Sequence, residues 1–148
     1  FNTPIYIYQN LNYVPRFFIV NKIEGFETTK KLLAEIKSMD IQKLTSKALF
    51  INEDIPGLNA SNFGGEGRVE LKSYQSDKII LSTQTNGKTV LVISNSYSKY
   101  WLACVNGKLK TVFPFYRAFQ GIILEAGHNK VVLQYVPPYK IGNSEVCN

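Results

Sequence analysis

The chain has few of the residues that usually mark a chemical site. Its 148 residues include one histidine, one tryptophan, one methionine and two cysteines. Two cysteines without partners at ligand spacing give no zinc motif. We expect Cys104 to be a buried small hydrophobic residue and Cys147, beside the C-terminus, to be a free thiol. A disulfide between them would need the tail to fold back onto the strand around Cys104.

Long apolar runs are also missing. No run reaches the roughly 18 residues that span a bilayer, and no signal sequence with basic, apolar and small-residue regions opens the chain. The stretch itself is therefore predicted to be soluble. It begins with Phe1 rather than methionine, so we expect a processed product or a part of a longer protein.

Positive charge is in excess but dispersed. Lysine and arginine number 17 against 11 acidic residues, which gives a net charge of +6. Arginine occurs only as Arg16, Arg68 and Arg117, and Lys30-Lys31 is the only adjacent basic pair. Nucleic-acid readers usually concentrate arginine and lysine on one stripe, so we expect no nucleic-acid partner. Weak attraction to an anionic membrane surface or polymer stays open.

The second half of the chain has the pattern of an antiparallel sheet. Short β-type runs alternate with turn residues at close spacing, which is typical of a β-sandwich. Asn86-Gly87 and Asn106-Gly107 each favour a two-residue hairpin, because both positions of such a turn need positive φ. Seven strands are predicted: Arg68–Tyr74, Lys78–Thr85, Thr89–Ser94, Trp101–Val105, Lys108–Val112, Ala118–Leu124 and Lys130–Val136.

The first third reads as mixed α and β. One helix is predicted over Glu27–Met39, because apolar residues recur there at helical spacing and Thr28 or Thr29 can cap its start. Three short strands are predicted there: Ile5–Tyr8, Arg16–Val20 and Ala48–Ile51.

Together these patterns predict a mainly-β fold. We expect one domain over 1–148, an antiparallel, jelly-roll-like β-sandwich with a smaller N-terminal α/β portion that carries one helix. Its parts are predicted to be the α/β portion over 1–51, a glycine-rich connector over 52–67 and the sandwich over 68–140. The connector lacks the spacing and the Lys-Ser/Thr ending of a phosphate loop, so a flexible link is favoured over a nucleotide site.

No catalytic group of residues is recognisable. His128 lies in a predicted turn without a ligand partner, and we expect it to pack on a neighbouring ring. The carboxylates do not pair as hydrolysis of a glycosidic bond would need. We therefore predict no catalytic residue, no metal and no cofactor for this chain.

Aromatic residues are the other candidates for a site. Exposed rings can stack on sugars, but a lone tryptophan in a sandwich is more often core, so burial of Trp101 is favoured. Tyr97 and Tyr100 precede the strand and are better candidates for exposure. Arg117 either binds an anionic group or, as we favour, pairs with a surface acid. The candidate ligand-binding residues are Asn95, Tyr97, Tyr100, Trp101 and Arg117.

Four motifs resemble a known family. They are Val92-Ile93-Ser94-Asn95-Ser96-Tyr97, Trp101-x-Ala103-x-Val105-Asn106-Gly107-Lys108, Ala118-Phe119-Gln120-Gly121-Ile122, and Ala126-Gly127-His128 followed by Leu133-x-Tyr135-x-Pro137-Pro138. With them the chain resembles the C-terminal soluble domain of the YfhO family of bacterial membrane proteins. The resemblance is strong over 90–140, loose over 14–51 and absent over 52–67. It departs at Asn95, where the family usually has Asp, and at Gln120, where an Arg is expected, and this removes a buried ion pair that the family pattern would allow.

The resemblance implies a location and a role. Members of the family are multi-spanning and resemble C-type glycosyltransferases, which take sugar from a polyprenyl-phosphate carrier. A domain like this one would lie on the extracytoplasmic face of the bacterial plasma membrane, beside the transmembrane portion of its own parent protein. The catalytic acid of such transferases lies in the membrane portion, so this chain would be a non-catalytic accessory domain.

The partner that the resemblance suggests is a cell-envelope glycan or anionic polymer, held as acceptor. Two alternatives stay open. One is a structural or protein-interaction β-sandwich domain with its aromatics buried, and the other is a free-standing secreted carbohydrate-binding module.

Overall fold

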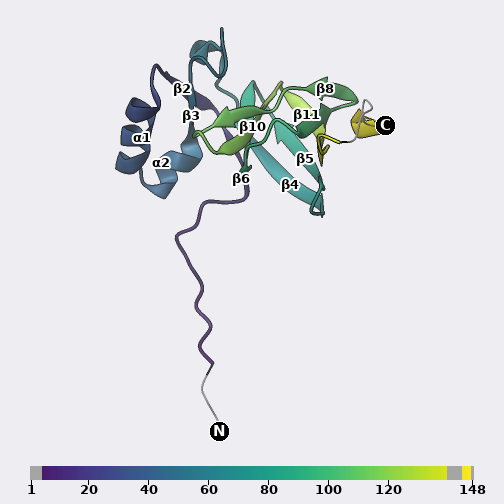
Figure 1. Cartoon of the computed structure of the whole chain (residues 1–148), viewed down its shortest axis with the longest axis horizontal. Helices are drawn as coiled ribbons and strands as arrows, with labels where there is room; N and C mark the ends of the chain where they lie inside the picture. Colours follow the sequence, from purple (N-terminus) through teal and green to yellow (C-terminus); the bar gives the residue numbers. More distant parts are fainter. Residues whose placement is uncertain (1–4, 140–144, 148) are drawn as a thin grey trace.

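The computed structural model describes residues 5–139 and 145–147, and apart from an extended N-terminal arm they form three packed layers (Figure 1). All strand pairs in the two larger sheets are antiparallel. The five-stranded sheet contains, in spatial order, β4 (Gly67–Tyr74), β5 (Lys78–Thr85), β11 (Gly127–Tyr135), β7 (Trp101–Val105) and β8 (Lys108–Lys110). The four-stranded sheet contains β1 (Phe17–Val20), β6 (Thr89–Ser96), β10 (Phe119–Leu124) and β9 (Phe113–Phe115).

The third layer is an α/β unit. Its elements are β2 (Lys22–Phe26), α1 (Thr29–Ser38), α2 (Ile41–Ser46) and β3 (Lys47–Ile51), and β2 pairs with β3 in parallel. Two short 3-10 turns, η1 (Ala60–Asn62) and η2 (Glu145–Cys147), complete the described elements. None of the helices in the described part of the chain is long and apolar enough to cross a membrane.

Strand β6 is covered on both faces. Leu91 and Ile93 point into the core between the two larger sheets, and Val90 and Val92 point into the core beneath the α/β unit. All four side chains are fully buried. Continuous burial, rather than alternation, is the expected pattern for a strand covered on each side.

The mainly-β prediction is confirmed, and most elements agree with it. The helix begins after its N-cap Thr28, whose hydroxyl accepts a hydrogen bond from the Lys31 N–H. The expectation of only one helix is wrong, because a second helix, α2, begins at Ile41 after its N-cap Asp40, whose carboxylate accepts a hydrogen bond from the Lys43 N–H. Strand β1, although it lies within 1–51, pairs with β6 in the four-stranded sheet.

The predicted hairpin is present at one of the two Asn-Gly pairs and absent at the other. Asn106 and Gly107 have φ of 51° and 77° and join the paired strands β7 and β8, so this hairpin is confirmed. The hairpin at Asn86-Gly87 is wrong: β5 and β6 belong to different sheets, and the pair marks the crossing between them. Asn86 instead exchanges hydrogen bonds with the backbone of Glu66.

Two further predictions about strands are corrected. Residues 5–8 form no strand but part of an extended arm that leaves the body of the molecule (Figure 1). The predicted strand over 108–112 ends at Lys110, and β9 follows it as a separate short strand. Strand β2 was also not predicted, because its KIEGF sequence has no clear β pattern.

The glycine-rich connector is tied to the sandwich. The N–H groups of Gly64 and Gly65 donate to the carbonyl oxygen of Lys88. A β-carbon added to Gly65 would lie 2.5 Å from the backbone of Gly87, so the two backbones are in close contact. This contact explains why glycine is needed there.

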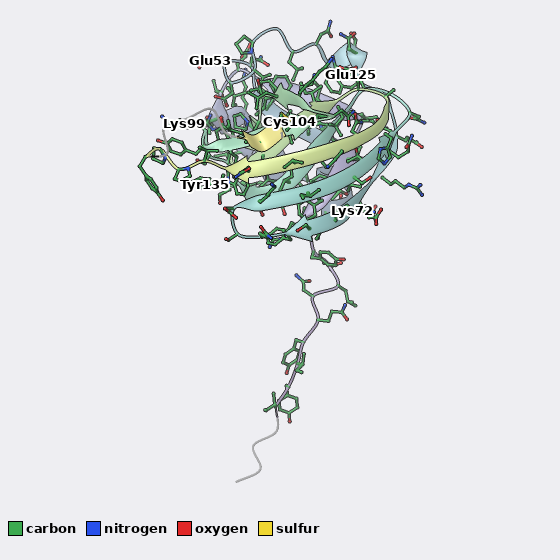
Figure 2. The ribbon with its side chains drawn as sticks, turned by 90° about the vertical axis from the view of Figure 1, so that its right-hand side faces the viewer. Glu53, Lys72, Lys99, Cys104, Glu125 and Tyr135 are labelled. Carbon is green, nitrogen blue, oxygen red and sulfur yellow. A yellow bond between two sulfur atoms is a disulfide. The ribbon has the colours of Figure 1, made fainter. Side chains whose placement is uncertain are left out.

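The expectation of free thiols is wrong. Cys104 and Cys147 form a disulfide, because the C-terminal turn η2 folds back onto the outer face of β7. Figure 2 shows Cys104 beside this turn, on the face of the five-stranded sheet that points away from the sandwich core. The two residues are 43 positions apart in the sequence, and the sequence alone could not decide whether the tail folds back onto β7.

Candidate functional site

The segment between β6 and β7 carries the predicted aromatic residues and is held at several points. The N–H of Tyr97 donates to the Ala118 carbonyl at 2.6 Å, and the Tyr100 carbonyl accepts from the Val136 N–H at 2.8 Å. The Trp101 N–H donates to the Ser98 carbonyl at 3.1 Å and closes a turn within the segment. These bonds fix where the rings of Tyr97 and Trp101 lie.

The hairpin of β7 and β8 lies beside this segment. The Asn106 side chain holds its turn against β11: its Nδ2 donates to Asn129 Oδ1 at 2.9 Å, and its Oδ1 accepts from the Lys130 N–H at 2.8 Å. In the hairpin, Ala103 pairs with Lys110 and Cys104 with Leu109 of the short edge strand β8.

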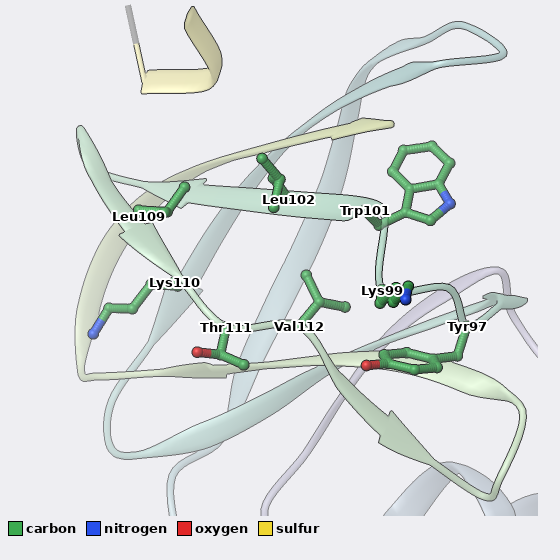
Figure 3. A pocket seen from close by; sticks show the side chains of 8 residues that line it. All are labelled: Tyr97, Lys99, Trp101, Leu102, Leu109, Lys110, Thr111 and Val112. Atoms are coloured by element: carbon green, nitrogen blue, oxygen red, sulfur yellow. The ribbon is translucent and has the colours of Figure 1, made fainter. Parts of the chain in front are cut away.

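A pocket of about 290 Å³ opens between the aromatic segment and the hairpin (Figure 3). Its described lining combines two aromatic rings, two lysines and small apolar side chains, and contains no carboxylate. The lining residues are Tyr97, Lys99, Trp101, Leu102, Leu109, Lys110, Thr111 and Val112. A surface of this kind can stack on a flat ring and attract negative charge.

The aromatic residues are half-buried rather than fully buried or exposed. Trp101 packs edge-on against Tyr135, with ring centroids 5.6 Å apart, and Tyr100 contacts the same ring at 6.2 Å. The Lys99 ammonium lies 5.4 Å from the centre of the Tyr100 ring. Tyr97 and Trp101 also pack against the sandwich core, so each ring has a buried part and an accessible part.

The structure brings only some of the candidate residues together. Tyr97 and Trp101 line the pocket, and Tyr100 lies next to it through its contact with Lys99. Asn95 lies elsewhere and accepts a hydrogen bond from Arg16 at 2.8 Å. Arg117 donates to Asp54 at 2.9 Å, so the expected pairing with a surface acid is confirmed.

Lys99 and Lys110 are pocket residues that sequence reasoning missed. Lysine is common and scattered in this chain, so nothing marked these two. Lys99 stands between Tyr97 and Tyr100, a signal that could have drawn attention to it. Lys110 reaches the pocket only because the Asn106-Gly107 hairpin folds β8 back beside β7.

His128 has a different environment from the one predicted. It lies in strand β11, opposite Gln84, and not in a turn. Its Nε2 is 3.0 Å from the Ser82 hydroxyl, and the described residues that line the hollow beside it include no aromatic ring: they are Arg68, Val69, Glu70, Ser82, Thr83 and Gln84. The expected packing on a neighbouring ring is therefore wrong. Within residues 5–139 and 145–147, no group of three or more metal-binding side chains is found.

Gln120, at the second departure from the family pattern, is fully buried in β10. Its Nε2 donates to the Ser96 carbonyl at 3.0 Å, while its Oε1 has no partner among the described residues. Asn95 thus bonds to Arg16 and Gln120 to the Ser96 carbonyl, and the two side chains do not bond to each other.

Two groups with shifted pKa values lie around the end of α2 and the start of β3, and one of them, Tyr116, joins the α/β unit to the rest of the molecule. Burial raises the pKa of the Tyr116 phenol, whose hydroxyl donates to the carbonyl oxygens of Leu44, at 2.7 Å, and of Lys47. Hydrogen bonding to Glu24 raises the pKa of the Lys47 ammonium, which also contacts Glu35. Both groups stabilise the end of α2 and the start of β3.

Comparison with known proteins agrees with the motifs. The model of one family, described as bacterial membrane protein YfhO, matches residues 6–143. No curated protein and no solved structure matches the chain. The match extends over the arm, the α/β unit and both larger sheets. The chain therefore belongs to the YfhO family of bacterial membrane proteins.

Proposed function

We propose that this chain is a non-catalytic accessory domain on the extracytoplasmic side of a multi-spanning, glycosyltransferase-like membrane protein. In this proposal the pocket at Tyr97 and Trp101 contacts an anionic glycan or polymer of the cell envelope, held as acceptor for the membrane portion. The observation that carries the proposal is the pocket itself, which places two half-buried rings beside Lys99 and Lys110.

The chemistry of the pocket supports an anionic saccharide. The accessible parts of Tyr97 and Trp101 offer apolar surface for a sugar face, and their buried parts hold the rings in place. Lys99 and Lys110 both line the pocket, and their positive charge favours carboxylate or phosphate groups along the ligand. Because no lining residue in the described part is acidic, a negatively charged ligand would meet no repulsion there.

The disulfide supports the extracytoplasmic location. Disulfides form and persist in oxidising environments and are rare in the reducing cytosol. The bond between Cys104 and Cys147 fixes the C-terminal turn η2 to β7, one of the two strands of the pocket hairpin.

The test is a binding titration followed by the fluorescence of Trp101, the only tryptophan in the chain. A poly(glycerol phosphate) polymer, an acidic polysaccharide and a neutral cell-wall glycan are titrated separately. We expect the first two to change the emission and to bind less tightly as salt rises. Lys110→Ala should weaken binding several-fold, whereas Lys108→Ala, on the same strand outside the pocket lining, should not.

Absence of binding by all three ligands would contradict the glycan role. Transferase activity of the intact membrane protein is the second measurement, and full activity after Tyr97→Ala and Lys110→Ala would remove the acceptor role. An intact protein without transferase activity would contradict the proposed parent activity.

A second candidate is a structural or protein-interaction domain. Its support is the packing of Trp101 and Tyr100 on Tyr135, which uses part of each ring for internal contacts. A free-standing secreted carbohydrate-binding module is the third candidate, and the reading frame upstream of Phe1 separates it from the others. That frame encodes many apolar spans in the membrane-protein proposal and none in the secreted one.

A further inference from the structure

The end of the molecule that carries α1 and α2 has an apolar groove. The groove has a volume of about 260 Å³ and lies between the two helices, β1 and the segment before β10. Its lining is almost entirely apolar and includes Val14, Leu33, Ile36, Leu44 and Phe119. Leu33, which lines the groove from α1, is 45% exposed.

The extended N-terminal arm continues this apolar surface. Val14 lines the groove, and the residues immediately before it run outward from the body (Figures 1 and 2). Large apolar and aromatic side chains of the arm are 62–93% exposed. They are Ile5, Tyr6, Ile7, Tyr8, Leu11 and Tyr13. Contiguous exposed apolar surface of this kind marks an interaction site.

Two lysines flank the exposed leucine. Lys30 and Lys37 stand three positions before and four positions after Leu33, so all three side chains share one stripe of α1. Both lysines are exposed, and neither takes part in the ion pairs found among the described residues. Lys31, on another side of the helix, is paired with Glu27 at 2.6 Å.

We propose that this basic-apolar face, made of the groove, the arm over 5–13 and Lys30 with Lys37, docks on the surface of an anionic phospholipid bilayer. Apolar side chains beside lysines suit the interface, where the former enter the acyl boundary and the latter meet lipid phosphates. Tyrosine, which the arm carries three times, is enriched at the same depth. The chain belongs to a family of membrane proteins, so a bilayer is close by in its native setting.

Charge argues against a second copy of the chain as the occupant. The chain has a net charge of +6, so two copies repel each other. A second copy would also have to present acidic groups to Lys30 and Lys37. An anionic bilayer supplies both the negative charge and the apolar layer that the face requires.

Docking through this face leaves the candidate pocket free. Figure 1 shows α1 and α2 at one end of the long axis, and β8 with the C-terminal turn at the other. The pocket is lined by β8 and therefore belongs to the far end. Membrane docking does not depend on glycan binding, and each can fail without the other.

The test is flotation of the 148-residue chain with lipid vesicles. We expect binding to vesicles that contain phosphatidylglycerol, little binding to pure phosphatidylcholine, and loss of binding in high salt. Leu33→Ser should weaken binding several-fold. Leu71→Ser is the matched control, because Leu71 is 46% exposed on strand β4, and it should bind like the parent chain. Ile5→Ser with Ile7→Ser tests the arm without touching a packed residue.

Lys30 and Lys37 are tested against a control variant that loses the same number of positive charges elsewhere. Lys30→Gln with Lys37→Gln should weaken binding by roughly fivefold or more. Lys108→Gln with Lys130→Gln removes the same charge from the five-stranded sheet and should have a much smaller effect. Equal losses in the two double variants would overturn the proposal, since general attraction to the vesicle would then explain the binding.

The depth of the arm in the bilayer is measured by quenching of tryptophan fluorescence. In a Trp101→Phe background, Tyr6→Trp places one reporter in the arm, and brominated phosphatidylglycerol should quench it. Trp101 in the parent chain should not be quenched. Absence of binding to phosphatidylglycerol vesicles, or a concentration-dependent dimer that Leu33→Ser abolishes, would refute the bilayer as the occupant.

Discussion

Cys104 of β7 and Cys147 of η2 are joined by a disulfide across 43 positions, and the bond closes the C-terminal turn over the outer face of a central strand. A cross-link of this span restricts the unfolded chain much more than the folded one. Native disulfides of this kind contribute about 2–4 kcal/mol to stability.

Loss of this disulfide should lower the free energy of unfolding by about 2–4 kcal/mol. The measurement is denaturant unfolding of the parent chain with and without reductant, compared with the Cys104→Ala, Cys147→Ala double variant. The reductant should have no effect on the double variant. Equal stability of the oxidised and reduced parent chains would contradict the stabilising role.

Gly65→Ala should destabilise the fold by about 1–3 kcal/mol, because the added methyl group would lie 2.5 Å from the Gly87 backbone. Gly64→Ala is the neighbouring control, since nothing lies within 4 Å of its added β-carbon, and it should stay within about 0.5 kcal/mol. Thermal or denaturant unfolding of the two variants gives the comparison. Equal tolerance at both positions would mean that the segment is not held against the sandwich.

Tyr116→Phe should cost about 1–2 kcal/mol near neutral pH, because the carbonyls of Leu44 and Lys47 lose their phenol donor. Burial raises the pKa of this phenol above the value of about 10 expected in the unfolded chain. Above about pH 10 the unfolded state therefore loses the proton first, and the stability of the parent chain falls.

The difference between the parent chain and Tyr116→Phe should narrow in the same alkaline range, as measured by denaturant unfolding at several pH values. Lys47 also has a raised pKa, so its contribution too is complete below about pH 10 and declines above it. Tyr13→Phe, an exposed position, serves as the control. A constant difference at all pH values would show that Tyr116 ionises alike in both states.

Arg117→Ala and Asp54→Ala should each cost less than about 1 kcal/mol, because the ion pair is partly exposed. A double-mutant cycle should give a coupling energy of about 0.2–1 kcal/mol that decreases in salt. Glycan titration of Arg117→Ala provides the second readout. Weaker binding without a coupling to Asp54 would return Arg117 to the binding site.

The sequence predicted a helix cap and a turn whose hydrogen bonds join residues close together in the chain. A cap at Thr28 or Thr29 and the Asn106-Gly107 turn were predicted because each satisfies its own backbone within a few residues. Asn86-Gly87 has the same two residues, but its neighbours Glu66 and Gly65 hold it in a crossing between sheets. The dipeptide does not contain that distant partner, so the prediction failed there.

The site was harder to predict than the fold. Tyr97 and Trp101 stood out by residue type, whereas Lys110 joins the same pocket lining only because the hairpin pairs it with Ala103. Arg117 and Asn95 were candidates of the correct chemical type, but Asp54 and Arg16 bind them elsewhere. Long-range pairing decides which polar residues meet, and it leaves no mark on a single sequence.

The burial of β6 on both faces has a consequence for how the molecule comes apart. Val90 and Val92 belong to the core beneath the α/β unit, and Leu91 and Ile93 belong to the core between the two larger sheets. Displacing this strand therefore opens both cores at once. A fragment that begins at Gly67 would lack β1 and would expose the Val90 and Val92 face to water. The α/β unit and the sandwich should therefore unfold in a single cooperative transition, and neither should persist when the other has melted.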